Sequence, residues 1–132
     1  MKYKGYCSDM TRTFFLGKPT TQQENVYQKV LDAQLAGIAQ IKAGAKAASV
    51  DKAARKSMGE DEKFFGHSFG HGIGLDVHES PNLSSKSKDI LKENMIVTAE
   101  PGIYLPGKFG VRIEDMGRVT KTGYENFTKI VK

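Results

Sequence analysis

The three histidines of the chain lie close together in a stretch that is rich in glycine. His67, His71 and His78 are separated by glycines that recur from residue 66 to residue 74. On an extended backbone, residues four apart share a face, so the side chains of His67 and His71 would point the same way. Glycine allows a backbone to approach a metal ion or a substrate closely. The residues alone leave open both a structural role and a metal-binding or substrate-binding role.

A carboxylate follows the most apolar short run of the chain. Glu100 comes directly after residues 95–99, which form a predicted buried strand, and directly before Pro101. Proline ends a strand ladder and favours an extended backbone at the residue before it. We therefore expect the Glu100 side chain to point into whatever cleft borders the end of this strand.

Two further acids lie in short segments that mix apolar and polar residues. Glu114 shares a strand face with Arg112, and Asp9 lies in a polar stretch after Cys7. Taken singly, Arg112 and Glu114 would fit an exposed ion pair of little energetic value, and Asp9 would fit the outward face of a strand.

Taken together, the acids and histidines indicate a metal site. Unpaired carboxylates inside a fold cost free energy, and a divalent cation is a common way to hold several of them together. One imidazole with several carboxylate oxygens suits Mn²⁺, Fe²⁺, Co²⁺ or Zn²⁺, and the oxygen content favours manganese.

The first half of the chain predicts one strand and two helices. A strand is expected over residues 6–16, with a turn at residues 17–19. Thr21 and Glu24 fit a capping box, which would open a helix that ends near Gly44. A shorter helix is expected to end at Gly59. The first helix would bury the stripe Tyr27, Leu31, Leu35, Ile38 and Ile41, and the second would bury Val50, Ala53, Ala54 and Met58.

The second half predicts mainly strands. Residues 66–74 are expected to form a strand or an ordered loop, residues 90–94 a short helix, and residues 95–99 a buried strand. Two more strands are expected over residues 111–120 and 127–131, joined by a turn at residues 121–123. This order predicts an α+β fold in which helices pack on one face of a mostly antiparallel sheet.

Composition limits the class of protein. The 132 residues suit one domain, and no apolar run reaches the length of about 18 residues that suggests a membrane span. The 20 basic residues exceed the 15 acidic ones, but the lysines are scattered along the chain, which favours a solvated surface over nucleic-acid binding. A single cysteine, Cys7, and the lack of a signal-like N-terminus lead us to expect the cytoplasm.

Four segments resemble the C-terminal part of the catalytic domain of Xaa-Pro peptidases, the aminopeptidase P and prolidase group of pita-bread metallopeptidases. They are GYCSDMTRT at residues 5–13, GHGIGLDVHE at 70–79, TAEPGIY at 98–104 and VRIED at 111–115. The segments occur in family order across essentially the whole chain. Methionine aminopeptidases share the GHGIG core, whereas RIED is similar to the Xaa-Pro branch. The resemblance implies a partial pita-bread (creatinase/aminopeptidase-like) fold with a curved sheet.

The resemblance also implies a centre of two divalent metal ions, manganese first and cobalt, zinc or iron as alternatives. Asp9 and Glu114 would bridge the two ions, while His71 and Glu100 would each ligate one of them. Glu100 would in addition act as the catalytic proton shuttle.

Three further residues are assigned by the resemblance to the substrate side of the centre. His78 would contact the substrate at the scissile bond and stabilise the tetrahedral intermediate. His67 would line the pocket near the proline of an Xaa-Pro peptide. Arg112 would support the metal ligands from behind.

The resemblance is incomplete at the N-terminus. A further aspartate ligand of the family would precede Met1, as would the first half of the pita-bread domain and the N-terminal domain. Residues 1–132 are therefore expected to be the C-terminal portion of a catalytic domain, inactive alone, with incomplete metal occupancy and an exposed sheet edge that promotes homo-oligomers. Whether the whole protein is an aminopeptidase or a dipeptidase stays open. The alternative is a non-catalytic pita-bread module that binds protein or nucleic acid, although such modules usually lose the ligands retained here.

Overall fold

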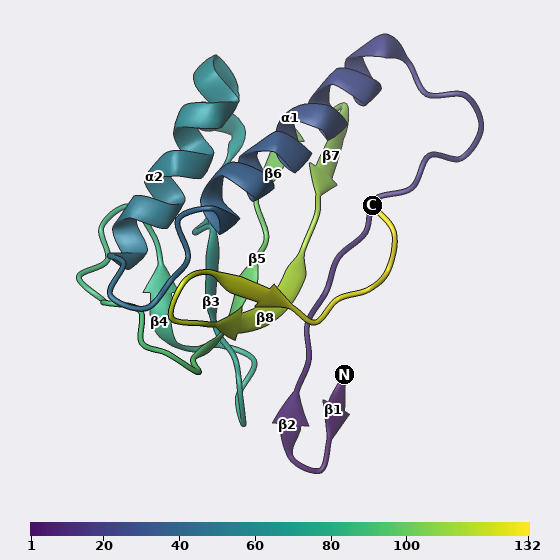
Figure 1. The fold of residues 1–132 in the computed structure, drawn as a ribbon. Helices are drawn as coiled ribbons and strands as arrows, with labels where there is room; N and C mark the ends of the chain where they lie inside the picture. Colours follow the sequence, from purple (N-terminus) through teal and green to yellow (C-terminus); the bar gives the residue numbers. More distant parts are fainter.

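The computed structural model describes all residues, Met1–Lys132, as two helices packed on a sheet (Figure 1). Helix α1 spans Thr21–Ile38, helix α2 spans Ala47–Met58, and the 3-10 helix η1 follows at Gly59–Phe64. The strands are β1 (Lys2–Tyr3), β2 (Tyr6–Cys7), β3 (Gly70–Gly72), β4 (Glu79–Leu83), β5 (Ile96–Ala99), β6 (Gly102–Leu105), β7 (Phe109–Arg112), β8 (Asp115–Val119) and β9 (Tyr124–Asn126).

The main sheet has the strand order β4-β3-β5-β8-β9, and every neighbouring pair is antiparallel. Strands β6 and β7 form a separate ribbon, and β1 and β2 form a hairpin near the N-terminus. Figure 1 shows both helices on one side of the sheet and the β1-β2 hairpin extending away from them. The expected α+β class with helices on one face of an antiparallel sheet is confirmed.

The core lies between the helices and the sheet, and glycine allows its closest approaches. The Phe69 ring is buried against α1 at Gly37, where a Cβ would lie 2.3 Å from the ring. Strand β3 runs so close to β5 that a Cβ at Gly70 would lie 2.1 Å from the Thr98 carbonyl oxygen. These contacts hold the histidine-bearing strand between a helix and its neighbouring strand.

Helix α1 begins one residue from the predicted cap. The N-cap is Thr20, whose side chain accepts the backbone N–H of Gln23, while the Gln23 side chain accepts the backbone N–H of Thr20. The predicted capping box of Thr21 with Glu24 is wrong, because Thr20 and Gln23, each one residue earlier, make the same two hydrogen bonds.

The end and the buried face of α1 also differ from the prediction. The helix ends at Ile38 and does not reach Gly44. The Ala43 N–H donates to the Thr120 carbonyl at 3.0 Å and the Gly44 N–H to the Leu91 carbonyl at 2.8 Å, so these residues pair with distant segments and do not continue the helix. Leu35 of the expected apolar stripe is 52% exposed. The helix instead buries Val26, Val30, Ala33, Gln34 and Gly37. The predicted second helix and its stop at Gly59 are confirmed as α2.

The short helix expected over residues 90–94 is wrong. Ile90 forms an isolated β-bridge with Lys46, and the Leu91 N–H donates to the Ala45 carbonyl at 2.9 Å. Asn94 has a φ of 70°, which reverses the chain before β5. Pairing with a segment distant in sequence therefore overrides the local pattern.

Three predicted strands are shorter than expected or absent. Within residues 6–16 only β2 is a strand, and Thr11 adds an isolated bridge to Glu114. Residues 111–120 are split into β7 and β8 by Ile113 and Glu114. Residues 127–131 form no strand, because β9 comes earlier, directly after the confirmed turn at residues 121–123.

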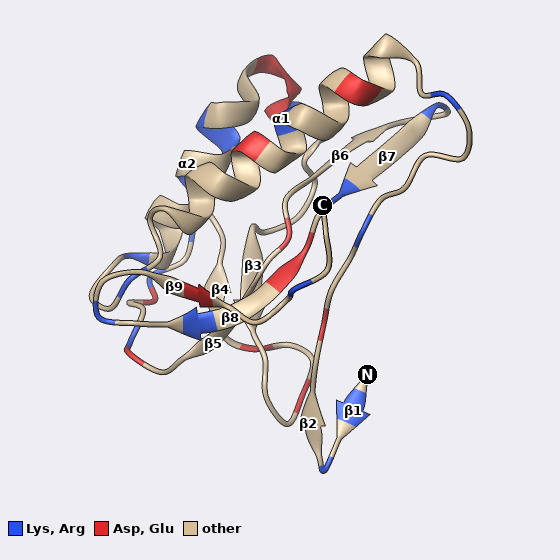
Figure 2. Ribbon diagram, turned by 45° about the vertical axis from the view of Figure 1, so that its right-hand side comes forward, with Lys and Arg blue, Asp and Glu red and all other residues tan.

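Charge is distributed over the whole molecule. Lys and Arg residues lie on β1, α2, β7 and β8, and acidic residues are interspersed among them (Figure 2). Neither helix is long and apolar enough to cross a bilayer.

Candidate metal centre

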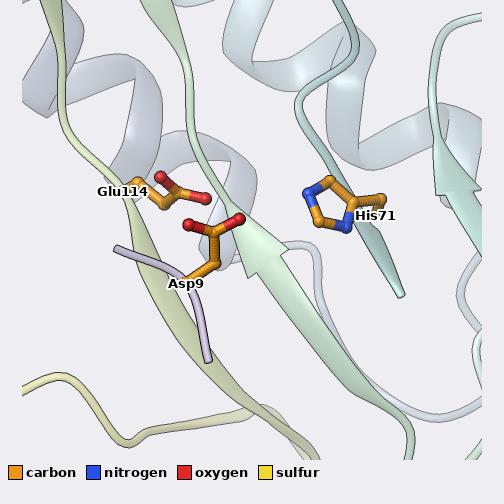
Figure 3. A group of neighbouring side chains, drawn as sticks. All are labelled: Asp9, His71 and Glu114. Carbon is orange, nitrogen blue, oxygen red and sulfur yellow. The ribbon is translucent and has the colours of Figure 1, made fainter. Parts of the chain in front are cut away.

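Three of the predicted ligands come together from three separate parts of the chain. Asp9 lies in the extended segment after β2, His71 is the central residue of β3, and Glu114 lies between β7 and β8. Each offers a ligand atom, and these atoms all lie within 4.8 Å of one another. Figure 3 shows the carboxylates of Asp9 and Glu114 pointing toward each other, with the imidazole of His71 facing them.

The segment that carries Asp9 is tied to the strand region that carries Glu114. The backbones of Thr11 and Glu114 pair, and the Thr11 hydroxyl donates to Glu114 Oε2 at 2.6 Å. Arg12 Nη2 lies 2.7 Å from Asp115 Oδ1, and both side chains are almost fully buried. Pairing of this kind satisfies charges that would be costly to bury alone.

Glu100 completes the group from the end of β5. Its Oε1 lies 3.0 Å from His71 Nε2, and it accepts a hydrogen bond from the Thr98 hydroxyl at 3.0 Å. Its backbone N–H donates to the Phe69 carbonyl at 2.7 Å, which ties the end of β5 to the approach to β3. The expected cleft-facing orientation of Glu100 agrees with this position.

The hydrogen bonds of His71 orient its ring. Nδ1 lies 2.9 Å from the Gly72 carbonyl oxygen, an acceptor only, so Nδ1 carries a proton and Nε2 faces Glu100. Burial alone would lower the pKa of His71, but the hydrogen bond to Glu100 and the contact with Gly72 outweigh it and raise the pKa. Burial would likewise raise the pKa of Glu100, but the hydrogen bond from His71 outweighs it and lowers the pKa. Anchoring of one ring nitrogen by a carbonyl is typical of metal-ligating histidines.

Glu114 is the clearest sign that the group suits a cation. It is only 2% exposed, and its Oε1 is a buried oxygen without a hydrogen-bond partner. Burial raises the pKa of Glu114 to about 7 despite the hydrogen bond from Thr11, and the carboxylates of Glu100 and Asp9 add to the rise. Repulsion among these carboxylates is what a divalent cation would remove, and oxygen donors with one imidazole are a suitable donor set.

A cleft of about 640 Å³ opens beside this group. His67 lies 2.8 Å from the Tyr104 hydroxyl through its Nε2, and the His78 ring centroid lies 4.3 Å from that of His71. The lining residues are His67, Ser68, His71, His78, Glu79, Ser80, Asn82, Glu100 and Arg112. The cleft therefore gathers every residue that was expected to contact substrate.

Arg112 supports Glu114 indirectly. Its Nε donates to the Thr11 hydroxyl at 3.0 Å, and that hydroxyl donates in turn to Glu114. The exposed Arg112–Glu114 ion pair considered from the sequence does not form, because Thr11 lies between the two side chains.

Several residues that position the site were not foreseen. Arg55 of α2 donates to the carbonyl of His67 at 2.7 Å, and Asp51 accepts the Phe69 N–H at 3.0 Å. The four-residue spacing of Asp51 and Arg55 on a helix predicts that the two side chains pair, but it does not predict that they bind the backbone beside the histidines. Tyr104 and Thr11 had no signal beyond their place in the matching segments.

Comparison with known proteins finds relatives of this chain among peptidases. Residues 1–121 match metallopeptidase family M24. The uncharacterized peptidase YqhT of Bacillus subtilis is 50% identical over 131 residues, which are 96% of this chain and 36% of that protein. The structure of an Xaa-Pro dipeptidase from Bacillus anthracis matches with a TM-score of 0.96 at 48% identity, covering 98% of this chain and 37% of that one.

An X-Pro aminopeptidase from Thermotoga maritima matches with a TM-score of 0.94 at 42% identity, again over 98% of this chain and 37% of that chain. The chain thus spans little more than a third of the length of these relatives. The agreement confirms the resemblance to Xaa-Pro peptidases and the partial pita-bread fold. Because the family match covers nearly all of the sequence, the chain belongs to metallopeptidase family M24.

Proposed function

We propose that this chain supplies most of the metal centre of a hydrolase that cleaves the peptide bond preceding proline, as an Xaa-Pro aminopeptidase or dipeptidase. The main support for the proposal is that ligand atoms of Asp9, His71 and Glu114 lie within 4.8 Å of one another. Glu100 adds to this group through its hydrogen bond with His71. Four candidate ligands retained on four separate segments argue against a non-catalytic module, which has no reason to keep them.

The four residues would hold two divalent ions, with manganese favoured by the three carboxylates. When bound, such a pair supplies Lewis-acid activation of water and of the peptide carbonyl. Glu114 would donate its unpartnered Oε1 and lose the proton that its raised pKa retains near pH 7. Metal binding would therefore compete with protonation at this residue.

The remaining side chains of the cleft would handle the substrate and its protons. Glu100, whose pKa is lowered, stays ionised and is available to accept a proton at its carboxylate. His78 lies at the cleft beside His71, where its ring can donate to an oxygen that gains negative charge. His67, held by Tyr104, would line the side of the cleft that receives the proline ring.

The whole activity would need more than these 132 residues. The relatives are nearly three times as long, and the proposal assigns a further aspartate ligand and the other half of the substrate pocket to sequence outside this chain. Alone, the chain is proposed to bind metal weakly and to lack peptidase activity. The lone Cys7 supports a reducing compartment, and we place the protein in the cytoplasm on that basis.

Metal binding by the chain is the first test. Titration with Mn²⁺ or Co²⁺ in a calorimeter should show saturable binding that is lost in His71→Ala. Lys121→Ala, an exposed residue in the turn before β9, serves as the matched control and should bind like the unmodified chain. No metal uptake by the unmodified chain would contradict the proposed centre and favour the non-catalytic module.

Complementation tests the peptidase activity. The part of the Bacillus anthracis Xaa-Pro dipeptidase that precedes the matched region would be fused or co-expressed with this chain, and hydrolysis of an Xaa-Pro dipeptide and a longer Xaa-Pro peptide measured with Mn²⁺. Cleavage of either peptide that disappears in His71→Ala is expected, and the preferred length separates dipeptidase from aminopeptidase. A correctly folded, metal-loaded hybrid that cleaves neither peptide would overturn the assignment.

A further inference from the structure

Gln34 is a fully buried polar residue on the face of α1 that packs against the sheet. Its exposed fraction is 0%, and its neighbours on this face are apolar, among them Val30 and Gly37. A buried amide is costly unless it is hydrogen-bonded, so its partners must account for its presence.

Both backbone partners of Gln34 directly precede a candidate metal ligand. Gln34 Nε2 donates to the Ala99 carbonyl at 2.8 Å and to the Ile113 carbonyl at 3.3 Å. Each of these carbonyls belongs to the peptide group that continues into the nitrogen of Glu100 or Glu114. Because the peptide group is planar, fixing the carbonyl also fixes the direction in which the next residue begins. One side-chain amide therefore spans the two peptide groups from which the glutamates project.

The other end of the amide is also held. Lys132 Nζ donates to Gln34 Oε1 at 2.7 Å and pairs with Asp115 Oδ2 at 2.5 Å. An ammonium group has donors only, so Oε1 must face Lys132 and both N–H groups of Nε2 must face the two carbonyls. The amide therefore has one orientation, with its NH₂ group toward the Ala99 and Ile113 carbonyls and its oxygen toward Lys132.

We infer that Gln34 is a positioning residue that sets the separation of Glu100 and Glu114 and thereby the affinity of the metal centre. This inference rests on the proposed function, because it concerns the same site. Gln34 makes no hydrogen bond to either ligand side chain and would act through the backbone on which each glutamate is carried. Its role differs from that of Thr11, which contacts the Glu114 carboxylate itself.

Two variants test the inference on the full chain, with Co²⁺ as the probe. Gln34→Met keeps the length of the side chain and removes every hydrogen bond. Gln34→Glu keeps an oxygen for Lys132 and replaces the N–H donors. We expect both to weaken Co²⁺ binding about 10- to 100-fold, as loss of outer-shell support commonly does, and to change the visible absorption spectrum of bound Co²⁺, which reports ligand geometry.

Val30→Ala is the matched control, because Val30 is equally buried on the same helix face and makes no hydrogen bond to the strand ends. It should lower the unfolding temperature while leaving the Co²⁺ affinity and spectrum unchanged. If Gln34→Met or Gln34→Glu is folded and binds Co²⁺ with unchanged affinity and spectrum, Gln34 is merely structural and the inference is wrong. If the unmodified chain binds no Co²⁺, the proposed centre itself fails, which is a different result.

Discussion

At Glu114, folding and metal binding place opposite demands on one side chain. The residue is buried with one oxygen unpartnered, and its pKa is raised from 4.5 to about 7. A cation needs the ionised form, whereas the metal-free fold retains the proton. A bound ion would therefore stabilise the charge that burial and the neighbouring carboxylates disfavour at this position.

The pH dependence of stability tests this conflict in protein treated with a chelator. A folded-state pKa above the unfolded value stabilises the fold below pH 4.5, and the contribution is lost as pH rises through about 7. The raised pKa of His71 also stabilises the fold at low pH and loses this contribution as the pH rises. The lowered pKa of Glu100 has the opposite effect, but at more acidic pH, where its contribution to stability is lost as the pH falls. The free energy of unfolding should fall by about 3 kcal/mol across this window.

Glu114→Gln isolates the effect, because a neutral amide retains the shape of the protonated acid. Urea unfolding of this variant should show a much flatter pH profile, together with loss of metal binding. Glu93→Gln, on the surface, should keep the original slope. An unchanged slope in Glu114→Gln would mean that other groups govern the pH response.

At the scale of elements, the contact between α1 and Phe69, the residue before β3, depends on the missing side chain of Gly37. A methyl group there would lie 2.3 Å from the Phe69 ring, between His67 and His71 in sequence. Gly37→Ala should destabilise the protein by about 1–3 kcal/mol, despite the better helix propensity of alanine, because the ring must move. Leu35→Ala on the exposed side should change stability by less than about 0.5 kcal/mol. Thermal unfolding of both variants measures the difference. Equal losses of stability would indicate that Leu35 contributes to the buried face of α1, as the sequence pattern predicts.

Elements with strong local signals were predictable. Helix α2 ends directly before Gly59, and β5 lies within the apolar run of residues 95–99, which ends shortly before Pro101. Residues 90–94 and 127–131 were not predictable, because the backbone partners of Ile90 and Phe127 come from residues distant along the chain: Lys46 for Ile90 and Met116 for Phe127. Local periodicity carries no information about such partners.

The candidate site was predictable in part. Glu100 stood out because an acid at the end of an apolar strand is unusual, and the resemblance added Asp9, His71 and Glu114 as a set. The burial of Gln34 could not be predicted, because a glutamine within a helix is ordinarily exposed; its burial and its bond to the Ala99 carbonyl depend on the sheet packed against the helix.

At the scale of the whole molecule, a segment without backbone partners remains exposed. Residues 12–16 make no backbone hydrogen bond, and Phe14 and Leu16 within them are 75% and 101% exposed. Unpaired backbone groups beside exposed apolar side chains promote pairing with another chain, as they do at open strand edges. The chain should therefore self-associate, with a mass in light scattering that rises with concentration. Leu16→Asp should shift it toward the monomer, whereas Leu35→Asp on α1 should not. A constant monomer mass for the unmodified chain would contradict the prediction.

The N-terminal arm, residues 1–10, is attached to the rest of the molecule by few hydrogen bonds, yet it carries Asp9. The Cys7 N–H donates to the Gly74 carbonyl at 2.7 Å, and the next attachments are at Thr11 and Arg12. Figure 1 shows the hairpin of this arm extending away from the helices. Local opening of the arm would remove one ligand without unfolding the core. A bound cation would therefore act as a latch, and amide hydrogen exchange at Cys7 and Thr11 should slow on adding Mn²⁺ while exchange in α2 stays the same. The rate at which the arm opens would then set the rate at which metal enters and leaves.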